Sequence, residues 1–188
     1  MYGAILGDII GQPYEWRNIK TKDFPLFKAR PRFTDDTVMT VAVCSGILEA
    51  GTDAGEKEMK KSFIRNMHRW GALYPDAGYG GTFMEWLDEE CEEPYNSWGN
   101  GSAMRVSSVG WFFDTLERTR EVARWSAEVT HNHPEGVKGA EATASIIWLS
   151  RNKKSKAEIK AFVEKEFGYD LSLTCDQIRP GYIFDVSC

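Results

Sequence analysis

The segment Phe33-Thr34-Asp35-Asp36-Thr37 leads directly into the apolar run Val38-Met39-Thr40-Val41-Ala42-Val43 and decides how this sequence folds. The apolar run continues to residue 50 and predicts a buried helix over residues 36–50. Two carboxylates and two hydroxyls then lie at its first turn. Hard oxygen donors packed this closely repel one another unless a proton or a cation lies among them. The segment is therefore either an N-cap, formed by Thr34 or Asp35, or part of a metal site.

Helical periodicity extends from this segment over most of the chain. The expected helices cover residues 3–11, 57–70, 82–87, 102–113, 116–129, 134–149 and 156–167, and residues 182–186 carry a strand-like pattern. Polar or glycine-rich loops separate the helices. The sequence therefore predicts an all-α fold, a compact orthogonal helical bundle formed by one domain over residues 1–188.

The composition excludes several classes of protein. The chain has a net charge of −5, and its Lys and Arg residues are spread along it, which argues against a nucleic-acid partner or an anionic membrane surface. No apolar run is long enough to span a bilayer, and the N-terminus lacks the basic start of a signal peptide. The cysteines form no metal-binding or disulfide pattern. We expect reduced thiols and a cytoplasmic protein.

Two loops and a carboxylate carry residues suited to ligand binding. The glycines of Gly78-Tyr79-Gly80-Gly81 permit close approach of a ligand, although an ordinary turn also explains them. The loop Ser97-Trp98-Gly99-Asn100-Gly101 runs into a helix start whose N–H groups can hold phosphate or ribose oxygens, or Ser102 simply caps that helix. Glu15 lies between two aromatic residues, where desolvation suits acid–base chemistry, or it is a solvated loop acid.

His131 also has two possible explanations, one functional and one structural. It lies in the loop 130–134, where a neutral imidazole can bind a ligand hydroxyl or phosphate, although a cap and turn before Pro134 would look the same. A zinc site formed by His131 and His133 alone is not expected, because their spacing does not place them on one helix face. His68 lies on the outer part of an amphipathic helix, and no function is assigned to it.

Taken in order, these segments resemble the ADP-ribosylglycohydrolase family, which includes the dinitrogenase reductase-activating glycohydrolase and the ADP-ribosyl-acceptor hydrolases. Each motif is weak alone, whereas their combination and order are specific. The resemblance rests on residues 3–8 with Glu15, on 33–37, on 78–81, on 99–105 and on 130–131, and it extends to at least Ala144.

The resemblance implies an all-α bundle with a dinuclear magnesium or manganese centre, in which Thr34, Asp35 and Asp36 ligate metal. It implies hydrolysis of a glycosidic bond at the C1″ atom of ADP-ribose, with Glu15, Asp35 and Asp36 as catalytic residues. The residues that match ligand-binding positions are Gly80, Gly81, Ser97, Gly99, Asn100, Gly101 and His131. Arg105 is expected to have a structural role, paired with a carboxylate near the site.

The sequence departs from the family pattern at its C-terminal end. Family members carry a second metal motif there, with two more aspartates and a threonine, and residues 1–188 contain no such motif. We therefore expect a shortened or incomplete domain whose helix 36–50 exposes apolar surface that a second copy covers. Three alternatives remain: a hydrolase of ADP-ribosylated substrates, an inactive protein that binds ADP-ribose or a nucleotide, and a helical interaction domain.

Overall fold

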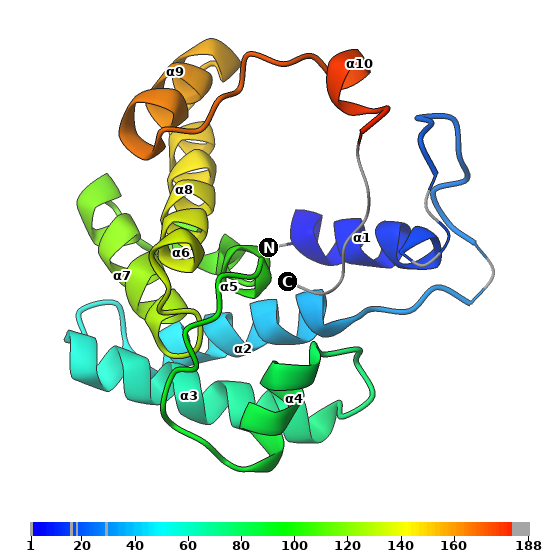
Figure 1. The fold of residues 1–188 in the computed structure, drawn as a ribbon. Helices are drawn as coiled ribbons and strands as arrows, with labels where there is room; N and C mark the ends of the chain where they lie inside the picture. Colours follow the sequence, from blue (N-terminus) through cyan, green and yellow to red (C-terminus); the bar gives the residue numbers. More distant parts are fainter. Residues whose placement is uncertain (1, 16, 18, 29, 182–188) are drawn as a thin grey trace.

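The computed structural model describes residues 2–15, 17, 19–28 and 30–181, and these residues form an all-α fold without a β-strand, as predicted (Figure 1). Its helices are α1 (Tyr2–Gly11), α2 (Asp35–Ala50), α3 (Glu56–Leu73), α4 (Gly81–Asp88), α5 (Gly101–Met104), α6 (Val109–Phe112), α7 (Leu116–Glu128), α8 (Pro134–Arg151), α9 (Lys156–Phe167) and α10 (Cys175–Ile178), with 3-10 turns η1 (Gln12–Tyr14) and η2 (Val106–Ser108). The strand-like segment 182–186 lies outside the described residues.

The core forms where α2 packs along α3 and α7 packs along α8. α2 supplies the largest share of it, with the buried side chains of Val38, Met39, Ala42, Val43 and Ile47. The buried side chains packed around α2 come from α3, α7 and α8: Met59, Phe63, Met67, Val122, Ala123, Ala140 and Ala144. The α2–α3 contact is close, because a Cβ atom on Gly46 would lie 2.7 Å from the Phe63 ring. The predicted burial of α2 is therefore confirmed.

The helix predicted over residues 102–113 is wrong, because three short elements, α5, η2 and α6, take its place. The break falls at Arg105, whose φ and ψ of −88° and −8° depart from helical values. Its side chain is almost completely buried and hydrogen-bonds to residues at the end of α7. A tertiary contact thus overrides the local helical pattern.

Gly110 on α6 allows this segment to pack closely against α8. A Cβ atom there would lie 2.6 Å from Ile147 and 2.9 Å from the carbonyl oxygen of Ala144. Gly139 on α8 is the matched control, since its Cβ would make an ordinary 3.7 Å contact with Ala103.

We expect Gly110→Ala to lower the free energy of unfolding by about 2 kcal/mol through overpacking. Gly139→Ala is expected to raise it by roughly 0.5–1 kcal/mol, because alanine favours the helix interior. Urea unfolding followed by far-UV circular dichroism measures both. Equal midpoints for Gly110→Ala and the wild type would contradict the close packing of α6 on α8.

The exposed apolar helix is α1, and the prediction that helix 36–50 carries the exposed apolar surface is wrong. α1 has no buried residue, and its Tyr2 and Leu6 are 84% and 48% exposed. On α2 the large exposed apolar side chain is Leu48, at 67%. Because α1 makes its main contacts with α2 and with the adjoining turn η1, it is the helix that a second copy would have to cover. Such a homo-oligomer stays a prediction.

Two further findings concern the described residues as a whole. None of their helices combines the length and the apolar character that crossing a bilayer requires. Among the described residues, Cys44, Cys91 and Cys175 are free thiols.

Candidate functional site

Most of the residues singled out in the sequence surround one cleft of about 1180 Å³. α1, η1, the start of α2, the loop before α4 and the loop before α5 form its walls. The predicted site residues that line it are Glu15, Thr34, Asp35, Asp36, Gly80, Gly81, Ser97, Asn100, Gly101 and His131. Gly99 does not line the cleft, and it is buried. The fold thus brings together segments that lie more than a hundred residues apart, while their roles stay predictions.

Asp8 is a site residue to which the sequence reasoning gave no role. Its carboxylate accepts hydrogen bonds from the backbone N–H and the hydroxyl of Thr34, both at 2.8 Å. It also accepts from the N–H of Thr37 at 3.2 Å and from the Thr37 hydroxyl at 2.5 Å. The free N–H groups and the dipole of a helix N-terminus favour a negative charge at this place. Asp8 therefore fastens α1 to the first turn of α2.

Thr34 is the N-cap of α2, so the capping interpretation of this segment is confirmed. Its hydroxyl oxygen accepts from the N–H of Asp36 at 3.3 Å and donates its proton to Asp8. The N–H of Asp35 donates to the carbonyl of Ala77 at 2.9 Å, which ties the helix start to the loop before α4. A capping role does not exclude metal ligation, because a hydroxyl oxygen has two lone pairs.

The carboxyl groups at this helix start have raised pKa values. Burial raises the pKa of Asp35 to about 7; the charge of Asp36 adds to the effect, and a backbone hydrogen bond opposes it. Burial, followed by the charge of Asp8, raises the pKa of Asp36. Burial and then the charges of Asp36 and Asp8 raise the pKa of Glu15. The groups lie close enough to oppose one another's ionisation, and a cation would relieve that repulsion.

The acidic cluster, comprising Asp8, Glu15, Asp35 and Asp36, offers only oxygen donors, which suit a hard divalent cation such as Mg²⁺ or Mn²⁺. None of the ion pairs formed within the described residues includes a member of it. Over the same residues, no three His, Cys, Asp or Glu side chains are grouped so that they could hold a metal ion. The cluster thus has the donor chemistry of a cation site, although its carboxylates are not gathered tightly enough to form one by themselves.

The loop before α4 forms a second wall of the cleft. Gly78 has a φ of +96°, a conformation that side chains rarely adopt, and the buried Tyr79 anchors the loop through a 3.0 Å hydrogen bond from its hydroxyl to the carbonyl of Tyr74. Gly80 is the N-cap of α4 and Gly81 its first residue. A Cβ atom at either glycine would meet nothing within 4 Å, so the backbone here is open toward the cleft.

The loop before α5 is held by side-chain contacts. The Asn132 side chain accepts from the backbone N–H of Asn96 at 2.7 Å, which ties the loop to the segment after α7. The hydroxyl of Ser97 accepts from the N–H of Gly99 at 3.2 Å. This bond turns the loop back on itself and accounts for the inward position of Gly99. The side chain of Asn100 is exposed and makes no capping hydrogen bond, so it is available to a ligand.

Arg105 does not pair with a carboxylate, which corrects the expectation from the sequence. Its guanidinium donates to the carbonyl of Ser126 at 2.6 Å and to the hydroxyl of Thr130 at 2.8 Å. It is only 1% exposed, and burial lowers its pKa to about 10. The negative end of the α7 dipole and its carbonyl groups replace the missing counter-ion. Arg105 therefore joins α5 to the end of α7, in the structural role predicted.

His131 lines the cleft beside Gly101. A Cβ atom on Gly101 would lie 2.8 Å from His131 Nε2, so only glycine lets the imidazole approach this loop. The ring is 6% exposed, and its Nδ1 atom is 2.8 Å from the hydroxyl of Thr130. Burial, followed by the charge of Arg105, lowers the pKa of His131 to about 3. The imidazole is therefore neutral over the physiological pH range.

This neutral histidine makes stability fall in acid. The unfolded chain takes up a proton at His131 below its ordinary pKa of about 6.5, whereas the folded chain does not until about 3. The free energy of unfolding therefore decreases as the pH falls through this window. Arg105 and Tyr95 face the ring, and neither changes charge there, since burial raises the pKa of Tyr95 to about 12.

We expect the stability difference between the wild type and His131→Gln to shrink with decreasing pH between about 6.5 and 4, at a slope approaching about 1.4 kcal/mol per pH unit. The carboxylates of the cleft are common to both chains, so their contributions cancel in the difference. Urea titrations at several pH values measure it. A difference that does not change with pH would contradict the burial of a neutral imidazole.

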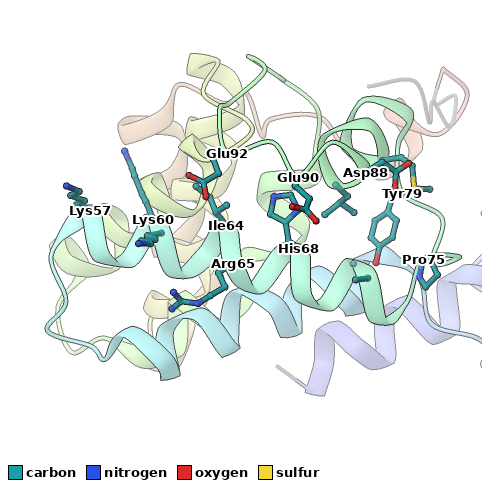
Figure 2. Close-up of a pocket in the computed structure, with 15 residues that line it drawn as sticks. Lys57, Lys60, Ile64, Arg65, His68, Pro75, Tyr79, Asp88, Glu90 and Glu92 are labelled. Carbon is teal, nitrogen blue, oxygen red and sulfur yellow. The ribbon is translucent and has the colours of Figure 1, made fainter.

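A second cavity, of about 770 Å³, lies along α3 beside α4, and Tyr79 of the loop before α4 lines both this cavity and the cleft (Figure 2). Lys57, Lys60 and Arg65 line one end of it, and no member of the acidic cluster lines it. His68 lies here, and it is not on an outer face as the sequence suggested. Its Nε2 atom is 2.9 Å from the carbonyl oxygen of Cys91, and its ring stacks on Trp86 at 4.2 Å. These contacts explain His68 as a packing residue.

Comparison with known proteins was made against family models and curated proteins. A family model described as ADP-ribosylglycohydrolase matches residues 1–179. ADP-ribosylhydrolase ARH3 of Bos taurus is 27% identical, over 93% of this chain and 54% of its own length. The Mus musculus protein of that name is 28% identical over 89% of this chain and 51% of its own length. The Homo sapiens protein is 27% identical over 83% of this chain and 50% of its own length. The chain spans about half the length of these relatives.

Proposed function

Because the chain belongs to the ADP-ribosylglycohydrolase family, we propose that it takes part in hydrolysis of the glycosidic bond between ADP-ribose and an acceptor, with the help of magnesium or manganese. The acceptor is a protein side chain or a small ADP-ribosyl compound. The related proteins are named as ADP-ribosylhydrolases, which supports this reaction class.

One observation carries the proposal. The acidic cluster and two glycine-rich loops line the same cleft, whose volume of about 1180 Å³ exceeds that of a typical site for a drug-sized ligand. A ligand with a diphosphate, two riboses and a base needs a cleft of this size. It also needs hydroxyl-binding groups at one place and open backbone at another, and both are present.

At the acidic end, Thr34, Asp35 and Asp36 are the residues that would hold the cation. When bound, the cation supplies positive charge that orients water and the ribose hydroxyls. Glu15 is the acid–base residue of the proposal: it accepts a proton from the attacking water or donates one to the departing acceptor atom, as carboxylates do in glycoside hydrolysis. Asp8 acts indirectly, since it holds Thr34 in place.

At the other walls, the backbone of Gly80 and Gly81 and the loop from Ser97 to Gly101 would bind phosphate and ribose oxygens. Open space surrounds Gly80 and Gly81, while Ser97, Asn100 and Gly101 line the cleft, and main-chain donors suit anionic oxygens. His131 would close this part of the site with a neutral ring. Because it carries no charge, it contributes a directed hydrogen bond and no Coulombic attraction.

The test uses the purified chain with ADP-ribose and Mg²⁺. We expect ADP-ribose to raise the melting temperature, by a stabilisation of about 2.7 kcal/mol at a hundredfold excess over the dissociation constant. Release of free ADP-ribose from serine-linked and arginine-linked peptides then identifies the linkage. No thermal shift at millimolar ADP-ribose, with or without Mg²⁺, would contradict the proposal.

The second candidate is a protein that binds ADP-ribose without cleaving it. It is favoured by the absence, over the described residues, of a side-chain group that could hold a metal ion. The same experiment separates the two functions. A thermal shift with ADP-ribose but no release from either peptide would assign binding alone to this chain.

A further inference from the structure

Thr130, directly after α7, connects a buried cation to the histidine of the cleft. Its hydroxyl oxygen lies 2.8 Å from an Arg105 Nη atom and 2.8 Å from His131 Nδ1. Thr130 is completely buried, so water does not reach the hydroxyl. Its proton must therefore find an acceptor among these neighbours, or it is left without a partner at a cost of about 1–3 kcal/mol.

Only one of the two neighbours can accept that proton. A guanidinium has five N–H donors and no acceptor, so Arg105 occupies a lone pair of the Thr130 oxygen. A neutral imidazole has one protonated and one unprotonated nitrogen, and the unprotonated nitrogen accepts. If Nδ1 carried the hydrogen, both neighbours would donate to Thr130 and its hydroxyl proton would have no acceptor within the described residues. The hydroxyl therefore donates to Nδ1.

This arrangement of protons determines the protonation of the second ring nitrogen, Nε2. With Nδ1 unprotonated, the hydrogen of the neutral ring lies on Nε2. Nε2 faces the Cα atom of Gly101 and makes no hydrogen bond to the described residues, while the ring lines the cleft. The lowered pKa of His131 agrees, since a doubly protonated ring would place a second cation beside Arg105.

We propose that Thr130 is a positioning residue that holds His131 in the tautomer protonated on Nε2, so that the ring donates a hydrogen bond to an acceptor oxygen of the bound ligand. This ligand atom is a phosphate, ribose or carbonyl oxygen and not an N–H group. The tautomer follows from the contacts of the ligand-free chain; only the identity of the ligand rests on the proposed function. Arg105 contributes because it occupies the hydroxyl oxygen and cannot accept from it.

The first test is the nitrogen spectrum of the imidazole rings in the ligand-free chain. Long-range proton–nitrogen correlation on histidine-labelled protein distinguishes the two neutral tautomers, and His68→Gln and His133→Asn variants assign the remaining signal to His131. We expect the pattern of a ring protonated on Nε2. A ring protonated on Nδ1 would overturn the proposal, and this result does not depend on any ligand.

The second test is a matched pair of substitutions. Thr130→Val keeps the shape of the side chain and removes the hydroxyl, whereas Thr130→Ser keeps the hydroxyl and removes the methyl group. We expect Thr130→Val to weaken ADP-ribose binding about tenfold and to populate both tautomers, and Thr130→Ser to retain the wild-type tautomer and an affinity within about threefold. If Thr130→Val kept the wild-type affinity and Thr130→Ser lost it, Thr130 would act through packing, and the proposal would be overturned.

These outcomes are separable from those of the proposed function. If the wild-type chain fails to bind ADP-ribose, the proposed function is contradicted while the ring spectrum still decides the tautomer. If Thr130→Val does not fold, the wild-type spectrum and Thr130→Ser decide it. Isothermal titration with ADP-ribose gives the affinities.

Discussion

Replacing Asp35 and Asp36 together with asparagine is expected to abolish every Mg²⁺-dependent effect of this chain. The two residues supply the carboxylate oxygens of the helix start, and amide oxygens bind Mg²⁺ far more weakly because they carry no charge. We expect the Mg²⁺-induced rise in melting temperature to disappear and any release of ADP-ribose to fall at least about 100-fold. Differential scanning fluorimetry and the peptide release assay measure the two effects.

The same double variant is expected to be more stable than the wild type in the presence of a chelator. Asp35 is partly buried, and neighbouring carboxylates raise the pKa of both groups. Removing the two charges relieves this repulsion, and we expect the free energy of unfolding to rise by about 1 kcal/mol. Such gains are common when the groups of a functional site that repel one another are replaced. Asp53→Asn with Glu117→Gln removes the same charge from exposed positions outside the cleft. A Mg²⁺ response that survives when Asp35 and Asp36 are both replaced would mean that the cation binds elsewhere.

The second large effect is expected at Asp8, whose loss should release α1 from the rest of the fold. The Asp8→Ala substitution removes four hydrogen bonds at the start of α2, and α1 has no buried residue to hold it otherwise. We expect the amides of α1 to exchange with solvent about 100-fold faster, which corresponds to about 2.8 kcal/mol of lost charge-assisted bonding. The amides of α3 and α7 should keep their rates, because the core lies between those helices and their neighbours.

Hydrogen exchange followed by mass spectrometry resolves these segments. Asp8→Asn is a graded control, since its amide keeps one acceptor oxygen and loses the charge, and it should fall between the wild type and Asp8→Ala. Asp53→Asn should leave α1 unchanged. Unchanged exchange of α1 in Asp8→Ala would show that apolar contacts with α2 hold this helix.

The sequence predicted the long helices well, because each carries its own start and stop signals. Thr34 caps α2 where the apolar run begins, and Ser155 forms a capping box at α9, which ends at Gly168 with a φ of +70°. Periodicity and caps are local properties, so they can be read without the fold. The motif segments of the cleft were also recognisable, as a family resemblance, since glycines and acids stand out in sequence.

What the sequence could not supply depends on contacts between distant segments. The break at Arg105 arises from a guanidinium that reaches the end of α7, and its lack of a carboxylate partner follows from the helix dipole there. The position of Gly99 away from the cleft depends on a bond to Ser97. Asp8 carried one usable signal, because it is the only charged residue in an otherwise apolar α1. A lone acid on such a helix points to a polar partner across the contact.

The contact between Asp8 and the first turn of α2 also has a consequence for how these positions vary among family members. One carboxylate accepts from both the backbone and the hydroxyl of Thr34 and of Thr37, so neither threonine can change without altering what Asp8 meets. Positions 8, 34 and 37 should therefore be inherited as a unit. In an alignment, sequences that lose the acid at position 8 should also lose the hydroxyls at 34 and 37, although 26 or more residues separate them along the chain.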